Sequence, residues 1–125
     1  MNKREKVYNK FSGKCAYSGT TLKTDWQIDH IVPKRKNGTN HISNLFPAQK
    51  IVNHYKRSLS VEDFRVHWLG GLHKRLAKLP KNPRTEKSKK RITYLWEVSN
   101  LFGITPEKPF NGIFYFETLE RKWEL

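Results

Sequence analysis

The stretch that decides the fold runs from Trp26 to Arg57 and reads WQIDHIVPKRKNGTNHISNLFPAQKIVNHYKR. Its first part, Trp26–Val32, predicts a strand, because apolar and β-branched residues lead up to a proline. The polar stretch Lys34–Ser43 contains an Asn-Gly dipeptide and predicts a loop. Leu45-Phe46 predicts a short return strand, and Ala48–Arg57 has the composition of a helix. The order along the chain is therefore strand, loop, strand, helix.

Polar residues suited to phosphodiester chemistry fall at the ends of these expected elements. Asp29 and His30 stand side by side near the end of the first strand, where adjacent side chains can share a site. Asn44 ends the loop, and Asn53 and Lys56 lie on the expected helix. Hydrolysis of a phosphodiester needs a base, which a neutral His supplies near neutral pH, a hard cation on oxygen ligands, and positive groups around the phosphate. An isolated Asp-His pair would more often be structural, but the segment offers all three kinds of group together.

Four elements between Lys14 and Arg57 also share one characteristic order and spacing. They are Cys15–Gly19, Asp29–Pro33, Asn37-Gly38 with Asn44-Leu45, and Asn53–Lys56. Together they resemble the HNH nuclease motif, which has a ββα-metal fold, over about a third of the chain. The resemblance implies an α+β protein with a ββα-metal (HNH) core, flanking helices and a C-terminal extension of helices and a strand.

The resemblance implies a role for each polar residue of the segment. His30 resembles the general base that activates water, and Asn44 resembles the central Asn, which braces the loop and fixes the strand that bears the His. Asp29 and Asn53 resemble ligands of one divalent cation, with Mg²⁺ or Mn²⁺ expected. A shift of one residue in register would make His54 the ligand instead, although the spacing from Asn44 favours Asn53.

The charge of the chain indicates a polyanionic partner. Its 25 Lys and Arg residues exceed its 11 Asp and Glu residues, which gives a formal net charge of +14. Binding of so basic a chain to nucleic acid is favoured because neutralised phosphates release condensed counterions. Charge alone would also suit a solvated basic surface, an anionic membrane surface or a ribosomal-type structural protein. The resemblance to HNH nucleases makes double-stranded DNA the expected partner, and no membrane is expected. The residues expected to contact phosphates are Lys34, Arg35, Lys36, Lys56 and Arg57.

The cysteine content separates this chain from many members of the family, which carry a zinc ribbon of two Cys-x-x-Cys pairs. Cys15 has Ser18 at the second position of its pair, and Gln49 and Val52 stand where the other pair is expected. One thiolate cannot build that site, so no structural zinc is expected. A single cysteine also excludes an intramolecular disulfide, and no apolar run approaches about 18 residues. These features predict a cytoplasmic protein of bacterial or phage type.

Outside the motif, the sequence predicts mostly helices. Asn2–Phe11 predicts a short basic helix, and a second helix is expected to begin at Ser60 and to be interrupted at Gly70-Gly71. The remaining expectations are a basic linker over Pro80–Lys90, a helix over Arg91–Phe102 and a strand over Ile113–Phe116.

We therefore expect residues 1–60 to form an HNH nuclease core with an N-terminal helix. Residues 61–125 are expected to form a helical extension that packs on this core as one unit and could contact DNA. The expected function is a metal-dependent DNA endonuclease or nickase. The alternatives are a DNA-binding protein that keeps the HNH fold without catalysis, and a non-specific, toxin-like nuclease. A homodimer would suit cleavage of both strands of a palindrome.

Overall fold

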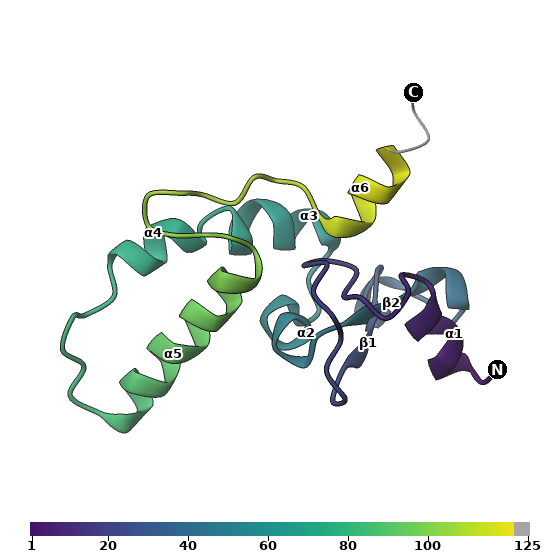
Figure 1. Cartoon of the computed structure of the whole chain (residues 1–125), viewed down its shortest axis with the longest axis horizontal. Helices are drawn as coiled ribbons and strands as arrows, with labels where there is room; N and C mark the ends of the chain where they lie inside the picture. The colour runs from purple at the N-terminus through teal and green to yellow at the C-terminus, as the bar shows by residue number, and fades with distance from the viewer. Residues whose placement is uncertain (122–125) are drawn as a thin grey trace. The chain divides into compact units, whose positions relative to one another are not determined.

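A two-stranded antiparallel sheet followed by a helix forms the framework of the motif segment. In this computed structural model, which describes residues 1–121, β1 (Gln27–His30) pairs with β2 (Leu45–Ala48), and His30 lies opposite Leu45. The connection contains two short 3₁₀ turns, η1 (Lys34–Lys36) and η2 (Ile42–Asn44). Helix α2 (Lys50–Lys56) follows β2 and contacts β1 (Figure 1). The expected order of strand, loop, strand and helix is confirmed.

Strand β1 ends two residues earlier than expected. After His30, the partner segment coils into η2, so residues 31 and 32 have no extended chain beside them. Their backbone N–H groups bond instead to Asn44. The Ile31 N–H donates to the Asn44 backbone oxygen at 2.9 Å, and the Val32 N–H donates to the Asn44 side-chain oxygen at 2.8 Å. The chain therefore leaves the sheet at the position where Asp29 and His30 stand.

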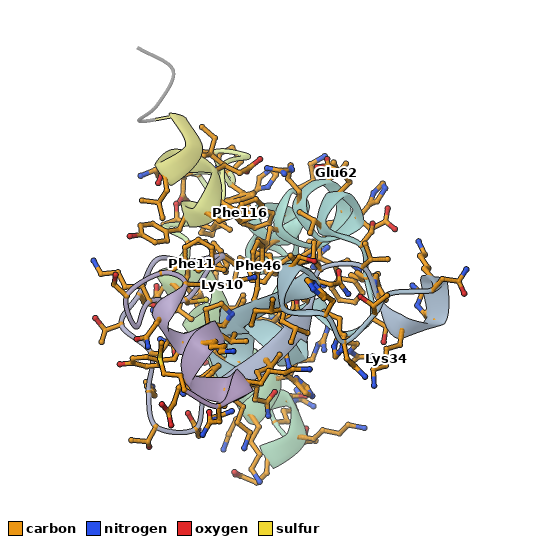
Figure 2. The ribbon with its side chains drawn as sticks, turned by 90° about the vertical axis from the view of Figure 1, so that its right-hand side faces the viewer. Lys10, Phe11, Lys34, Phe46, Glu62 and Phe116 are labelled. Carbon is orange, nitrogen blue, oxygen red and sulfur yellow. The ribbon has the colours of Figure 1, made fainter. Side chains whose placement is uncertain are left out.

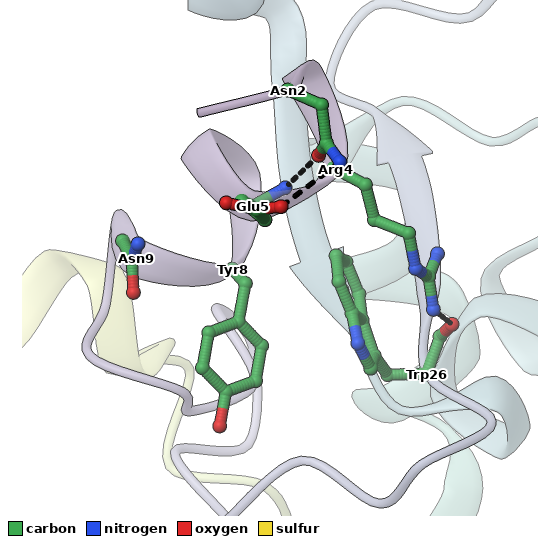
Figure 3. A pocket seen from close by; sticks show the side chains of 6 residues that line it. All are labelled: Asn2, Arg4, Glu5, Tyr8, Asn9 and Trp26. Carbon is green, nitrogen blue, oxygen red and sulfur yellow. Dashed lines mark hydrogen bonds between the residues drawn. The ribbon is translucent and has the colours of Figure 1, made fainter.

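Helix α1 (Lys3–Asn9) packs beside the entry to β1. It begins at Asn2, whose side-chain oxygen accepts a hydrogen bond from the Glu5 backbone N–H at 2.8 Å, as an N-cap does. The Arg4 guanidinium lies 3.8 Å from the centre of a Trp26 ring and donates to the Trp26 backbone oxygen at 2.8 Å (Figure 3). Tyr8 contacts the same indole at a ring separation of 5.8 Å. These contacts leave Trp26 only 7% exposed and fix the start of the strand.

Aromatic side chains form much of the core around the sheet. Tyr17 lies 5.7 Å from Phe46 and 5.2 Å from Phe114, measured between ring centres. Phe116 lies 4.9 Å from Phe46, and Phe11 lies 5.4 Å from it on another side (Figure 2). Aromatic pairs of this kind contribute about 0.5–1.5 kcal/mol each beyond their buried area. The two aromatic residues near the C-terminus thus stabilise the sheet of the motif segment.

The strand expected over Ile113–Phe116 is wrong, because the chain there enters helix α6 (Tyr115–Arg121). The Glu117 carboxylate accepts a hydrogen bond from the Phe114 backbone N–H at 2.9 Å, which is the back-bond of a capping box. The N–H groups of Tyr115 and Phe116 donate to backbone oxygens of Tyr17 and Ala16. These bonds satisfy the first turn of a helix, so the short aromatic run does not need a strand partner.

Gln49 links the loop after Cys15 to the start of α2. Its side-chain nitrogen donates to Thr21 O at 2.7 Å and to Thr20 Oγ1 at 3.0 Å, and its oxygen accepts from the Lys23 backbone N–H at 3.1 Å. Gln49 is 4% exposed, and a buried amide with all these bonds satisfied is a strong tether. Gln49 occupies a position at which a zinc ribbon would have cysteine, and here hydrogen bonds hold the loop.

The described chain divides into two compact units: residues 1–63 together with those from 113 onward, and residues 64–112. The helix expected from Ser60 forms α3 (Val61–Asp63), a π-helical stretch η3 (Phe64–Leu69) and α4 (Leu72–Ala77). It is interrupted at Gly70-Gly71, as expected. The chain at Gly70 leaves no room for a side chain, because a Cβ there would meet the Val66 backbone oxygen. The buried apolar residues of the second unit are Phe64, Leu69, Leu72, Leu76, Leu95, Val98 and Ile104.

The prediction of a linker over Pro80–Lys90 is wrong for its last five residues, 86–90, which are helical. Helix α5 (Glu86–Leu101) begins at Glu86, and the Thr85 hydroxyl accepts from the Ser88 backbone N–H at 3.1 Å to cap it. The later residues Leu95 and Val98 are buried and anchor the helix. The Thr85 cap and the packing of the second half together extend the helix into a basic stretch whose like charges repel one another. Within residues 1–121, no helix is both long and apolar enough to span a bilayer.

Candidate active site

A surface cavity of about 260 Å³ lies where the end of β1 meets the last turn of α2. Its lining residues are Ile28, Asp29, His30, Pro33, Lys34, Asn53, Arg57 and Ser58. Five of the residues singled out from the sequence therefore meet at one cavity, although they come from a strand, a loop and a helix. The antiparallel pairing of β1 and β2 positions them, because it brings α2 back beside the strand that carries Asp29 and His30.

Asp29 is held by two buried partners. The Tyr17 hydroxyl donates to its Oδ2 at 2.5 Å, and the Lys56 ammonium lies 3.1 Å from Oδ2 and 3.3 Å from Oδ1. Asp29 is 4% exposed and Lys56 is 0% exposed. Burial raises the pKa of the Asp29 carboxyl, while Lys56 and the Tyr17 hydrogen bond act in the opposite direction. Burial, and then the charge of Asp29, raise the pKa of Tyr17, so this hydroxyl stays protonated and donates.

His30 is oriented by a residue that the sequence did not single out. Its Nε2 lies 2.9 Å from Oδ1 of Asn40. An amide oxygen can only accept, so Nε2 carries the hydrogen and donates it. In the neutral ring, Nδ1 then holds the lone pair and is the atom able to take a proton. Asn40 is itself tied by the Lys3 ammonium, which donates to its backbone oxygen at 2.8 Å. In sequence, an Asn in a polar loop looks like a turn residue, so no signal identified it.

Asn44 clamps the loop that follows β1 and does not line the cavity. Its Oδ1 accepts from Val32 N at 2.8 Å, and its Nδ2 donates to Val32 O at 3.1 Å and to Thr39 O at 2.9 Å. The loop passes so close to Val32 that a Cβ on Gly38 would lie 1.7 Å from the Val32 backbone oxygen. The side chain of Asn44 and the absence of one at Gly38 together fix the chain just beyond His30.

Of the two candidate ligands on α2, Asn53 lines the cavity and His54 does not. The Asn53 side-chain nitrogen donates to Gln27 Oε1 at 2.8 Å, so Asn53 Oδ1 is the acceptor that it can offer to a cation. His54 is exposed on the same helix. The cavity lining therefore agrees with the spacing from Asn44, which favours Asn53 over His54 as the candidate ligand.

The five basic residues expected to contact phosphates have different surroundings. Lys34 and Arg57 are exposed and line the cavity. Lys36 is exposed outside it, and Arg35 is exposed with its Nε donating to the Ser58 backbone oxygen at 2.9 Å. Lys56 is wholly buried against Asp29, so it presents no surface to a phosphate and instead compensates a buried carboxylate.

The oxygen donors at the cavity fit a hydrated divalent cation. Tyr17 and Lys56 together contact Oδ2 of Asp29 twice and Oδ1 once, and a carboxylate has about four acceptor sites, so Oδ1 keeps a site for a cation. Asn53 Oδ1 adds a neutral oxygen donor. Ions such as Mg²⁺ keep several waters and need only one or two protein ligands. No cluster of three or more His, Cys, Asp or Glu side chains able to hold a metal occurs within residues 1–121.

Comparison with known proteins gives one result that bears on this cavity. Residues 13–49 match the family described as HNH endonuclease. The matched span includes β1, the clamped loop and β2, with Asp29, His30 and Asn44, and it ends just before α2. Neither the curated proteins nor the solved structures gave a match. HNH domains are typically nucleases that act on DNA with a divalent metal ion. The resemblance of this chain to the HNH endonuclease family is therefore confirmed over residues 13–49.

Proposed function

We propose that this protein is a DNA endonuclease or nickase that depends on one divalent cation, with His30 as the general base. The observation that carries the proposal is the convergence of Asp29, His30 and Asn53 on one cavity. A base, two oxygen donors and the positive side chains of Lys34 and Arg57 are the groups that phosphodiester hydrolysis requires.

Each residue at the cavity would have a separate role in the reaction. Nδ1 of His30 takes a proton from the attacking water, while Asn40 holds the Nε2–H and keeps the ring in the required tautomer. Lys34 and Arg57 bind and orient the phosphate at the cavity. Asp29 and Asn53 would hold Mg²⁺ or Mn²⁺, which when bound neutralises charge that develops on the phosphate oxygens. Tyr17 and Lys56 keep the Asp29 carboxylate in position.

A second candidate function is DNA binding without cleavage. One observation favours it: the Asp29 carboxylate is 4% exposed and already paired with Lys56. If that pairing persists in the DNA complex, Asp29 would offer little to a cation. Cleavage assays separate the two functions directly.

The first experiment is incubation of the purified chain with supercoiled plasmid in Mg²⁺, in Mn²⁺ and in EDTA. Nicked or linear product is expected with either metal and not with EDTA. Asn53→Ala should lose most of this activity, and His54→Ala, on the same helix but outside the cavity, should keep it. Salt-sensitive DNA binding without any cleavage would contradict the nuclease proposal and support the second function. Loss in the His54 variant alone would reverse the choice of ligand.

Asn40 should act as a positioning residue for His30. Asn40→Ala removes the acceptor for Nε2–H, so the ring can adopt the wrong tautomer, and kcat should fall on the order of tenfold or more. Asn40→Asp keeps an acceptor and should restore most of the rate. Steady-state kinetics should place the effect in kcat, with KM for DNA and the midpoint of thermal unfolding unchanged. Equal losses in both variants, or a lowered midpoint, would show that Asn40 serves the fold of the loop.

A further inference from the structure

The second unit carries a basic segment, residues 78–91, that the proposed reaction does not use. It contains seven basic residues and one acidic residue, Glu86. All seven basic side chains are exposed. They are Lys78, Lys81, Arg84, Lys87, Lys89, Lys90 and Arg91.

The placement of these charges does not help helix α5 to form. The N-terminal end of a helix carries partial positive charge and favours acidic residues, yet Lys87, Lys89 and Lys90 lie in the first turns of α5. Lys87 is also three residues from Lys90 and four from Arg91, and like charges at these spacings repel. One exposed ion pair, Lys89 with Glu86 at 3.3 Å, offsets part of this repulsion.

The second half of α5 holds the first half in place. Leu95, Val98 and Ser99 are buried, and Glu97 is the one charged residue in positions 92–101. The charge is therefore concentrated at one end of the helix and the packing at the other. This arrangement presents four of the seven cations, Lys87, Lys89, Lys90 and Arg91, on a folded helix.

We propose that the basic segment binds the phosphate backbone of duplex DNA, as a second contact surface on the unit that does not hold the catalytic cavity. A polyanion relieves the repulsion among these cations and gains from release of its own counterions. Five of the seven residues are lysines, which act as flexible point charges and suit backbone contacts rather than reading of bases. The binding is therefore independent of sequence. The choice of DNA as the polyanion rests on the proposed function.

The test compares two triple variants that remove the same charge. The first variant changes three residues of the basic segment to Gln: Lys87, Lys90 and Arg91. The second, a control, changes three exposed residues outside the segment to Gln: Lys6, Lys23 and Lys108. Affinity for a labelled duplex of about 20 base pairs is measured by fluorescence anisotropy in EDTA over a range of NaCl concentrations. Three lost phosphate contacts should weaken binding on the order of 100-fold near 0.1 M salt and lower the salt slope by about 3. The control should weaken binding less than about fivefold.

Each outcome decides the proposal. Equal weakening in both variants, or an unchanged salt slope, would overturn it, because net charge alone would then explain the loss. Tighter binding of an RNA duplex that depends on the same three residues would overturn the choice of DNA. Thermal unfolding of both variants should match the wild type, since all six residues are exposed. Binding in EDTA does not require cleavage. The test of the basic segment would therefore remain valid even if the protein proved not to be a nuclease.

Discussion

Replacing His30 with alanine is expected to slow DNA cleavage on the order of 10²-fold to 10⁴-fold while leaving DNA binding intact. The variant removes Nδ1, the atom that the Asn40 hydrogen bond leaves able to accept a proton from water. The ring is half-buried at the rim of the cavity, so its loss should cost little of the fold. Single-turnover cleavage with Mg²⁺ and duplex binding in EDTA measure the two properties separately.

His41 provides the matched control for His30. His41 lies in the connection that follows β1. It is exposed, bonds to the Ser43 hydroxyl at 2.7 Å and does not line the cavity. His41→Ala should therefore cleave at close to the wild-type rate. A near wild-type rate for His30→Ala would show that another group is the base. Parallel loss of cleavage and binding would point to a structural role for His30.

Replacing Lys56 with alanine is expected to lower the free energy of unfolding by about 3–5 kcal/mol, because it leaves the buried Asp29 carboxylate without its cation. The Lys56 ammonium also donates to the His30 backbone oxygen at 3.3 Å, which would lose this partner. Domains of this size have about 5–15 kcal/mol in total, so the loss is a large part of the stability. Urea unfolding followed by fluorescence of the four tryptophans measures it.

Two further variants test whether the buried pair causes that loss. Lys50→Ala changes an exposed lysine on the same helix and should alter the unfolding free energy by no more than about 0.5 kcal/mol. Combining Lys56→Met with Asp29→Asn removes both charges and should recover much of the stability that Lys56→Ala loses. If Lys56→Ala costs less than about 1 kcal/mol, Lys56 is not buried against Asp29 in solution.

The elements that could be predicted were those with a strong local signal. The strand, loop, strand and helix of residues 26–57 were predicted because apolar runs, an Asn-Gly turn and the motif spacing agree within one segment. In the two segments whose element type was wrong, a cap and packing elsewhere in the fold outweigh the local pattern of residues. Residues 86–90 are helical because Leu95 and Val98 anchor α5, and residues 115–116 are helical because their N–H groups bond to Tyr17 and Ala16.

The sequence by itself determined the residue types of the site and their order: Asp29-His30 at the end of a strand, Asn44 in the loop and Asn53 on a helix. It could do so because the motif lies in one short segment, where the residue types and their order along the expected elements follow directly from the sequence. The tertiary structure alone decided which partners these residues have. It placed Lys56 against Asp29, 27 positions away, Asn40 against His30, ten positions away, and Gln49 against Thr20, 29 positions away. Such contacts depend on how the strands and the helix pack, and neither propensity nor spacing carries that information.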